Sequence, residues 1–201
     1  MIAAAALVWG ALLAGSTASA QGGLYIGGSL GKSDIDDEIA IPHFITSGTV
    51  DGKSSGFKIF GGVQFNPYFG LDLAFVDLGK ASYSGSYFGT PVTGGTAEVW
   101  GFNVSAVGTV PISEGFAVFG RIGLFAWEAK ARDTTGGFPF SATENGGDFS
   151  WGLGLSYGFT KNISARVEWE RFGLGGGGYG YDWNVDLGHA NLLSLGVVYS
   201  F

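Results

Sequence analysis

The chain has 201 residues and no cysteine, with a net charge of −7 and a pI of about 4.6. Its length suits one domain, its 46% hydrophobic residues exclude a disordered acidic tail, and its acidic balance argues against nucleic acid as a partner. Only 13% of the residues are charged and 38 are glycine, which is unusual for the water-facing side of a soluble sheet. No apolar run reaches the ~20 residues that a spanning helix needs, so insertion in a membrane would have to use strands.

The first twenty residues have the pattern of a secretory signal peptide. An apolar stretch over 2–15 precedes Ala18, Ser19 and Ala20, which match the A-x-A cleavage site of such signals. No Lys or Arg precedes Lys32, so the usual basic start is missing, and an N-terminal membrane anchor is the alternative. We predict a signal peptide over 1–20 and a barrel domain over 21–201.

Eight segments alternate bulky apolar residues with small residues, as the two faces of a strand do. In the last segment, Leu195 and Val197 alternate with Ser194 and Gly196. Because the residues of the second face are small rather than charged, we expect this face to line a narrow interior. The face with bulky apolar residues would then point outward into lipid. The pattern predicts an all-β, eight-stranded antiparallel up-and-down transmembrane β-barrel, with a soluble lipocalin-like barrel as the alternative. The expected strands are 24–32, 57–65, 69–78, 98–110, 116–130, 149–159, 163–172 and 190–201.

The connections between these strands alternate in length. Short turns rich in Asn, Pro, Gly or Ser are expected at 66–68, 111–115 and 160–162. Long polar loops are expected at 33–56, 79–97, 131–148 and 173–189. This is typical of a barrel with one end in the periplasm and the other outside, and an even number of strands places both termini at the short-turn end.

Aromatic residues gather near both ends of the expected strands, where membrane interfaces would lie. The alternative is that these rings are core residues of a soluble barrel. At the short-turn end they are Phe65, Tyr68, Phe69, Phe116, Phe159, Tyr199 and Phe201, and at the other end Phe75, Trp100, Trp151 and Trp169.

Few charged residues occupy the inward positions, and the three positive ones balance the three negative ones. An eight-stranded barrel has room only for its own side chains, and an unpaired charge there costs several kcal/mol, so we expect pairing. The pairing would make a structural polar plug, and a switchable gate over a narrow ion path is the alternative. The six residues are Lys58, Asp72, Arg121, Arg166, Glu168 and Glu170.

Three stretches resemble the eight-stranded domain of OmpA-type outer-membrane proteins: GGVQFNPYFGLDLAFVDLG at 61–79, GLGLSYGFTKNISARVEWERF at 152–172 and the closing LSLGVVYSF. The resemblance implies the outer membrane of a Gram-negative bacterium, reached by export. It also implies contact with outer-membrane lipids and lipopolysaccharide, and recognition of the C-terminal strand, which ends on Phe201, by the barrel-assembly machinery. The best-known members add a periplasmic peptidoglycan-binding domain, and since nothing follows Phe201 here we do not expect a cell-wall tether.

In this resemblance Asp72, Arg121 and Arg166 match positions of an interior ionic network. Val107 and Ser156 stand where relatives have a lysine and a glutamate. The network must therefore be rewired, and Lys58, Glu168 and Glu170 are the residues that could complete it.

No motif predicts catalysis, a metal site or a cofactor. The run Asp34, Asp36, Glu38 starts like a calcium loop, but Ile39 and Ile45 occupy the required glycine and glutamate positions. The Gly-rich tract at 173–180 is followed by no helical pattern, which argues against dinucleotide binding.

The two histidines, His43 and His189, lack metal spacing. His189 near Asp186 is the one enzymatic candidate, and it matches no deacylase signature. We therefore expect no enzyme.

The expected function is structural, in envelope integrity and surface interaction. A narrow pore for ions or very small solutes, lined by the six inward charges, is one alternative. The other is an adhesin that binds a host or matrix ligand through the long loops. Because the loops are acidic, we expect their rim to repel phosphate-rich head groups unless divalent cations bridge them.

We predict that Arg166→Ala lowers the resistance of the barrel to unfolding and leaves its targeting to the outer membrane intact, because it removes one charge from a balanced interior. A urea titration in detergent measures this. A variant as stable as wild type would show that the interior pairing is irrelevant.

Overall fold

The fold is described from a computed structural model, in which residues 23–35, 47–87, 90–133, 140–175 and 188–201 are placed. The signal peptide predicted over 1–20 lies outside these residues, as do Asp36, Glu38, His43 and Asp186.

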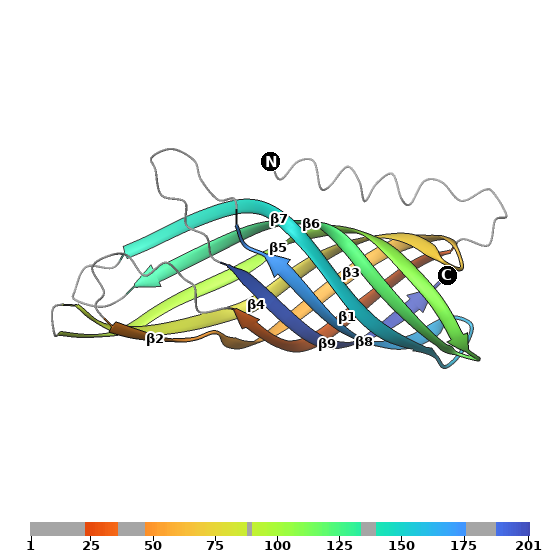
Figure 1. The fold of residues 1–201 in the computed structure, drawn as a ribbon, viewed down its shortest axis with the longest axis horizontal. Helices are drawn as coiled ribbons and strands as arrows, with labels where there is room; N and C mark the ends of the chain where they lie inside the picture. Colours follow the sequence, from red (N-terminus) through yellow and green to blue (C-terminus); the bar gives the residue numbers. More distant parts are fainter. Residues whose placement is uncertain (1–22, 36–46, 88–89, 134–139, 176–187) are drawn as a thin grey trace.

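The described chain forms one closed antiparallel β-barrel (Figure 1). From β3 to β9 each strand pairs with the next along the chain, and β1 pairs with both β3 and β9, which closes the circle. β2 and β3 both pair with β4 and together make one crossing, so the nine strands form the eight-stranded up-and-down barrel that the sequence predicted. The strands are β1 Leu24–Ile35, β2 Ser47–Asp51, β3 Lys53–Asn66, β4 Phe69–Tyr87, β5 Thr90–Ser113, β6 Phe116–Asp133, β7 Phe140–Gly158, β8 Ile163–Gly173 and β9 His189–Ser200.

The three short turns lie where they were predicted, and side chains and a glycine shape them. The Oδ1 atom of Asn66 accepts a hydrogen bond from the backbone N–H of Phe69 at 3.0 Å, which closes the β3–β4 turn. Gly115, between β5 and β6, has a φ of 82°, a conformation that glycine adopts without strain. The backbone N–H of Phe201 donates to the carbonyl of Leu24, so the start of β1 and the end of β9 meet at this short-turn end.

Two segments predicted as long loops are mostly strand. β4 and β5 continue through 79–97 as far as Tyr87 and Thr90, and β6 and β7 continue through 131–148 with a gap only at 134–139. In these segments small and polar residues occupy both odd and even positions. The alternation that marks a strand with one apolar face therefore disappears, although the backbone hydrogen bonds between strands continue. As a result β2, β4, β5, β6 and β7 form a sheet that projects beyond the ends of β1, β8 and β9 (Figure 1, left).

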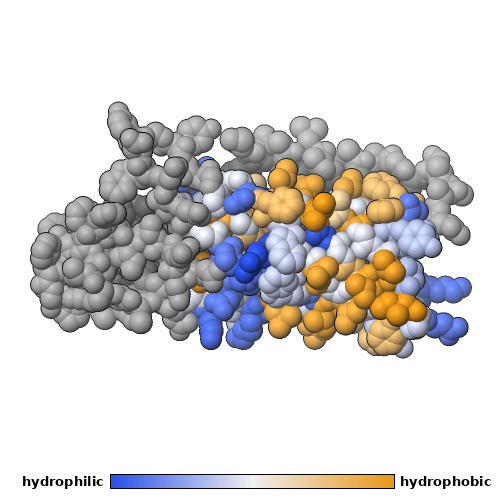
Figure 2. All heavy atoms as spheres, in the orientation of Figure 1, coloured by the Kyte–Doolittle hydropathy of each residue, from blue (hydrophilic) through white to orange (hydrophobic). Residues whose placement is uncertain are grey.

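The bulky face of the strands points outward, as predicted. Leu153, Leu195 and Val197 have 57%, 62% and 59% of their surface exposed. On the face drawn in Figure 2, apolar side chains of this belt cover the part of the barrel toward the short turns.

The lumen differs from the predicted interior of small residues and ions, because it also holds large apolar side chains. Phe60, Phe125 and Phe172 are fully buried, and Trp127 is 2% exposed. These rings occupy space that inward glycines on neighbouring strands leave open, since a Cβ atom on Gly101 would lie only 2.6 Å from the Phe125 ring. Small inward residues are thus partners for rings on the next strand rather than the lining of an open channel.

Two adjacent glycines of β1 test this packing. A Cβ atom on Gly27 would collide with the Phe60 ring, whereas the nearest atom to a Cβ on the outward Gly28 is 3.8 Å away. We expect Gly27→Ala to lower the free energy of unfolding by roughly 1–3 kcal/mol through overpacking.

The control, Gly28→Ala, is expected to change it by less than about 0.5 kcal/mol. Urea titration of both variants in detergent measures the difference. Equal stability of the two variants would contradict the assignment of Gly27 to the packed interior.

Candidate functional site in the lumen

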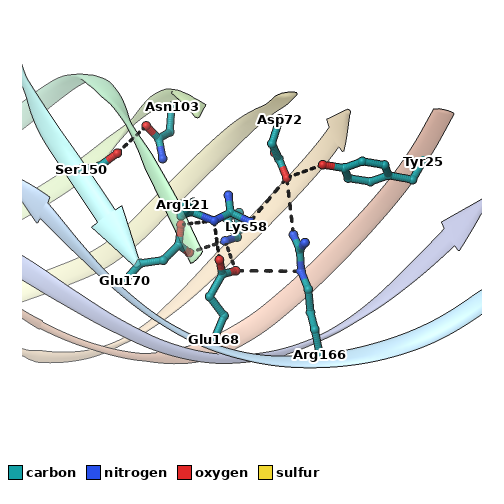
Figure 3. Close-up of polar contacts among 9 residues, drawn as sticks. All are labelled: Tyr25, Lys58, Asp72, Asn103, Arg121, Ser150, Arg166, Glu168 and Glu170. Atoms are coloured by element: carbon teal, nitrogen blue, oxygen red, sulfur yellow. Dashed lines mark hydrogen bonds and ion pairs between the residues drawn. The ribbon is translucent and has the colours of Figure 1, made fainter. Parts of the chain in front are cut away.

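The structure brings the six inward charged residues together in one buried cluster (Figure 3). They come from four strands, β3, β4, β6 and β8, and none exposes more than 7% of its surface. We call this set the charge cluster; it consists of Lys58, Asp72, Arg121, Arg166, Glu168 and Glu170.

Glu168 is at the centre of the charge cluster, since it contacts all three cations. Lys58 Nζ lies 2.6 Å from Glu168 Oε2, and Arg166 Nε lies 3.9 Å from the same oxygen. Arg121 Nε is paired with the other oxygen, Oε1. Glu170 supplements it by pairing with Lys58 and by lying 3.5 Å from Arg121 Nε.

Asp72 closes the opposite side of the charge cluster. Its Oδ2 atom lies 3.4 Å from Arg121 Nη2 and 3.8 Å from Arg166 Nη2. The hydroxyl of Tyr25, on β1, donates a hydrogen bond to the same oxygen at 3.2 Å. Each charge therefore has at least one partner of opposite sign, which offsets the desolvation cost of its burial.

Small residues on the neighbouring strands make room for these long side chains. Gly152 of β7 is in register with Arg121 on one side and Glu170 on the other. A Cβ atom there would lie 2.7 Å from Glu170 Cγ. Gly154 stands opposite Glu168 in the same way, so β7 presents a strip of glycine between the charges of β6 and β8.

Two aromatic residues of the site were not named from the sequence. The guanidinium carbon of Arg166 lies 3.5 Å from the centre of the Phe60 ring, a cation–π contact, and Tyr25 supplies the hydroxyl described above. Both side chains point inward: Phe60 is the next inward residue after Lys58 on β3, and Tyr25 is the inward residue before Gly27 on β1. Strand parity could therefore have found them, had large rings been considered as lumen side chains.

An apolar layer fills the lumen on the side of the charge cluster away from the short turns. Phe125 and Phe172 lie further along β6 and β8 than Arg121 and Glu170, and their ring centres are 4.7 Å apart. Between the two layers, Ser150 Oγ donates a hydrogen bond to Asn103 Oδ1 at 2.8 Å. The fully buried members of the apolar layer are Val76, Leu78, Phe125, Phe172, Leu174, Ala190 and Leu192.

The aromatic residues expected at the interfaces form two separate groups on the outside. At the short-turn end Tyr199 and Phe201 pack with their ring centres 5.1 Å apart, next to the exposed rings of Phe65, Tyr68, Phe69, Phe116 and Phe159 around that rim. At the far edge of the belt the ring centres of Trp151 and Trp169 are 5.0 Å apart, and those of Trp100 and Phe75 are 5.9 Å apart.

Two other candidates from the sequence lie near strand ends, on β9 and β1. His189 begins β9 opposite Gly173, and Asp34 is exposed near the end of β1. No group of three or more His, Cys, Asp or Glu that could hold a metal ion occurs in the placed part of the chain. The same residues contain no helix long and apolar enough to cross a membrane.

A closed barrel with an apolar outer belt and a charge-paired lumen defines a class of protein, the transmembrane β-barrels of the bacterial outer membrane. The family model described as "Outer membrane protein beta-barrel domain" matches residues 2–201. The chain therefore belongs to this family and is an outer-membrane protein of the Gram-negative type.

Comparison with curated proteins supports the same family. The chain is 29% identical to outer membrane protein A of Shigella flexneri over 187 residues, which is 88% of this chain and 48% of that protein. It is 27% identical to outer membrane protein A of Klebsiella pneumoniae, with 88% and 50% covered. The chain thus spans about half the length of the curated relatives that it matches.

Solved structures of low sequence identity share the fold. OprG of Pseudomonas aeruginosa superposes with a TM-score of 0.62 at 12% identity, covering 90% of this chain and 96% of that one. Neisserial surface protein A gives a TM-score of 0.60 at 15% identity, covering 89% and 97%. Ail of Yersinia pestis, solved with the heparin analogue sucrose octasulfate, gives 0.51 at 16% identity, covering 90% and 97%.

The central position of Glu168 gives a test of the charge cluster. Glu168→Gln leaves three buried cations with two carboxylates, and we expect it to lower the free energy of unfolding by about 3–5 kcal/mol. Adding Lys58→Met restores the balance of charge, so the double variant should lose less than the sum of the two single losses.

The matched control is Glu98→Gln, which breaks a pair with Lys80 at the surface. We expect a loss below about 1 kcal/mol from it, as for other exposed pairs. Urea titrations in detergent provide all four values. Strict additivity of Lys58→Met and Glu168→Gln would contradict direct coupling between these side chains.

Proposed function

We propose that this protein is a closed structural barrel, which stabilises the outer membrane and carries a surface for interactions outside the cell. The observation behind this proposal is the two-layered lumen. A path along the axis would have to cross both the charge cluster and the apolar layer, and fully buried side chains occupy both.

The apolar layer argues against the alternative of a narrow ion pore. Rearranging the pairs among Lys58, Glu168 and Arg121 could open the charge cluster, but the rings of Phe125 and Phe172 would still lie across the lumen. An ion would pay a large desolvation cost to pass such a layer. The charge cluster is therefore a structural plug, and its cost of burial is offset by the pairing described above.

The projecting sheet supports the surface part of the proposal. β4, β5, β6 and β7 run well beyond the ends of β8 and β9, so they raise backbone and side chains above the membrane. Residues 140–149 of β7 have no β8 partner among the described residues, because the β7–β8 pairing stops at Ser150. An open strand edge is a common place for an extended ligand to add a strand.

The route to the membrane is part of the same proposal. Export would use the signal peptide over 1–20, and the barrel-assembly machinery would recognise β9 with its terminal Phe201. The rings at the short-turn rim and the tryptophans at the far edge of the belt would sit at the two membrane interfaces, where aromatic side chains are enriched.

We expect the purified full chain to be electrically silent in a planar lipid bilayer, because two filled layers block the lumen. Asp72→Asn should be silent as well, since it leaves the apolar layer in place. A shift in gel mobility on boiling, measured on the same preparation, verifies that the barrel is folded and inserted. Steady openings in wild type, with a conductance that changes in Asp72→Asn, would overturn the plug and establish the pore.

A further inference from the structure

Most of the cations of this protein lie on its outer surface, toward the strand ends away from the short turns. Of its ten Lys and Arg residues, three belong to the charge cluster and Lys161 lies in the β7–β8 turn. The other six occupy outward strand positions on the side of the apolar belt away from the short turns. These six are Lys32, Lys53, Lys80, Lys130, Arg132 and Arg171.

Two of the six contact only neutral atoms within the described structure. Arg171 Nε donates to Asn191 Oδ1 at 3.0 Å, and Lys32 Nζ donates to Ser55 Oγ at 3.1 Å. No carboxylate lies within ion-pair distance of either side chain in the placed part of the chain. Within the described residues, therefore, no carboxylate neutralises the positive charge of Lys32 or Arg171.

On the opposite wall of the barrel, two of the cations are paired with carboxylates. Lys80 Nζ lies 2.7 Å from Glu98 Oε1, and Lys130 Nζ lies 3.1 Å from Glu128 Oε1. Lys80 and Lys130 are thus each paired with a carboxylate, whereas Lys32 and Arg171 contact neutral groups. This contrast separates a specific basic site from a general excess of surface lysine.

Arg171 and Lys32 lie close enough to act together. Arg171 is in register with Asn191, and the next outward row joins Trp169, Leu193 and Lys32 across β8, β9 and β1. Adjacent strands are about 4.8 Å apart and residues rise about 3.4 Å along a strand, so two strand spacings and two residues, roughly 12 Å between backbones, separate the two cations. Both long side chains can reach toward a ligand between them. Asp34 lies on the same wall opposite Lys53 of β3, a pair that leaves the local net charge unchanged.

The depth of this basic site matches that of a lipid head group. The Arg171 guanidinium carbon lies 5.8 Å from the centre of the Trp169 ring, and Trp169 packs on Trp151. Tryptophan marks the boundary between head groups and acyl chains. Below the site, the exposed side chain of Leu193 offers an apolar contact for an acyl chain.

We propose that Arg171 and Lys32 bind a phosphate group of an outer-leaflet lipid, the phosphorylated glycolipid lipopolysaccharide, with Asn191 and Trp169 orienting its head group. The planar guanidinium matches two phosphate oxygens, and the lysine adds a second charge from the neighbouring side. The proposal rests on the proposed membrane location but not on a closed lumen. It also differs from the expected repulsion of phosphate-rich head groups, because Arg171 and Lys32 add positive charge to this wall.

The experiment uses full-length protein in phosphatidylcholine nanodiscs, titrated with lipopolysaccharide, with binding followed by native mass spectrometry. The double variant Arg171→Gln/Lys32→Gln removes the site, and Lys80→Gln/Lys130→Gln removes the same number of charges from the paired wall. We expect at least about tenfold weaker binding for the first double variant, which corresponds to about 1.4 kcal/mol. The second should stay within about threefold of wild type, because its cations are already neutralised.

Three further arms keep the result decisive. A mobility shift on boiling shows that each variant is folded, and single-channel recording tests the plug independently, so failure of the site and failure of the proposed function are distinguishable. Dephosphorylated lipopolysaccharide should bind wild type as weakly as it binds the Arg171→Gln/Lys32→Gln variant. Sucrose octasulfate serves as a soluble polyanion.

Equal losses in the two double variants, or undiminished binding of the dephosphorylated lipid, would overturn the phosphate site. Tighter binding of sucrose octasulfate than of lipopolysaccharide at Arg171 and Lys32 would overturn the lipid as the ligand and identify the wall as a site for soluble sulfated ligands.

Discussion

Closure of the sheet between β1 and β9 is the constraint on which the rest of the structure depends. The two strands pair from Tyr25 and Ser200 through Ile35 and Ala190, so the hydrogen-bond ladder has no free edge within the barrel. In hydrocarbon an unpaired N–H or C=O group costs several kcal/mol, and a closed barrel avoids that cost. Once closed, the barrel can present an apolar belt to lipid while its lumen is removed from both lipid and bulk water.

That isolation explains the two layers of the lumen. Burial makes each charge expensive, so the three cations gather around Glu168, Glu170 and Asp72, and none is left without an opposite charge. The remaining volume is filled by rings, which pack against inward glycines on the next strand. Glycine therefore has two uses here: it lets charges meet across β7, and it accommodates aromatic side chains.

Beyond the membrane the constraint is relaxed, and the architecture changes accordingly. The hydrogen-bond ladders of β4 to β7 continue past the belt, although small or polar residues occupy both faces of the strands there. For this reason the sequence pattern predicted loops at 79–97 and 131–148. The wall formed by β8, β9 and β1 ends earlier and carries Arg171 and Lys32 at the head-group level. One side of the barrel thus extends into the surroundings, and the other is suited to a lipid.

The sequence by itself determined the number of crossings, the positions of the short turns and the outward direction of the bulky apolar face, because alternation with period two and turn residues are local signals. It also placed Lys58, Asp72, Arg121, Arg166, Glu168 and Glu170 on the inward face. Only the tertiary structure decided that Glu168 meets three cations from three different strands, and that Phe60 and Phe125 fill the lumen. Which inward side chains meet depends on the register and tilt of strands around the whole barrel, and no local pattern encodes these.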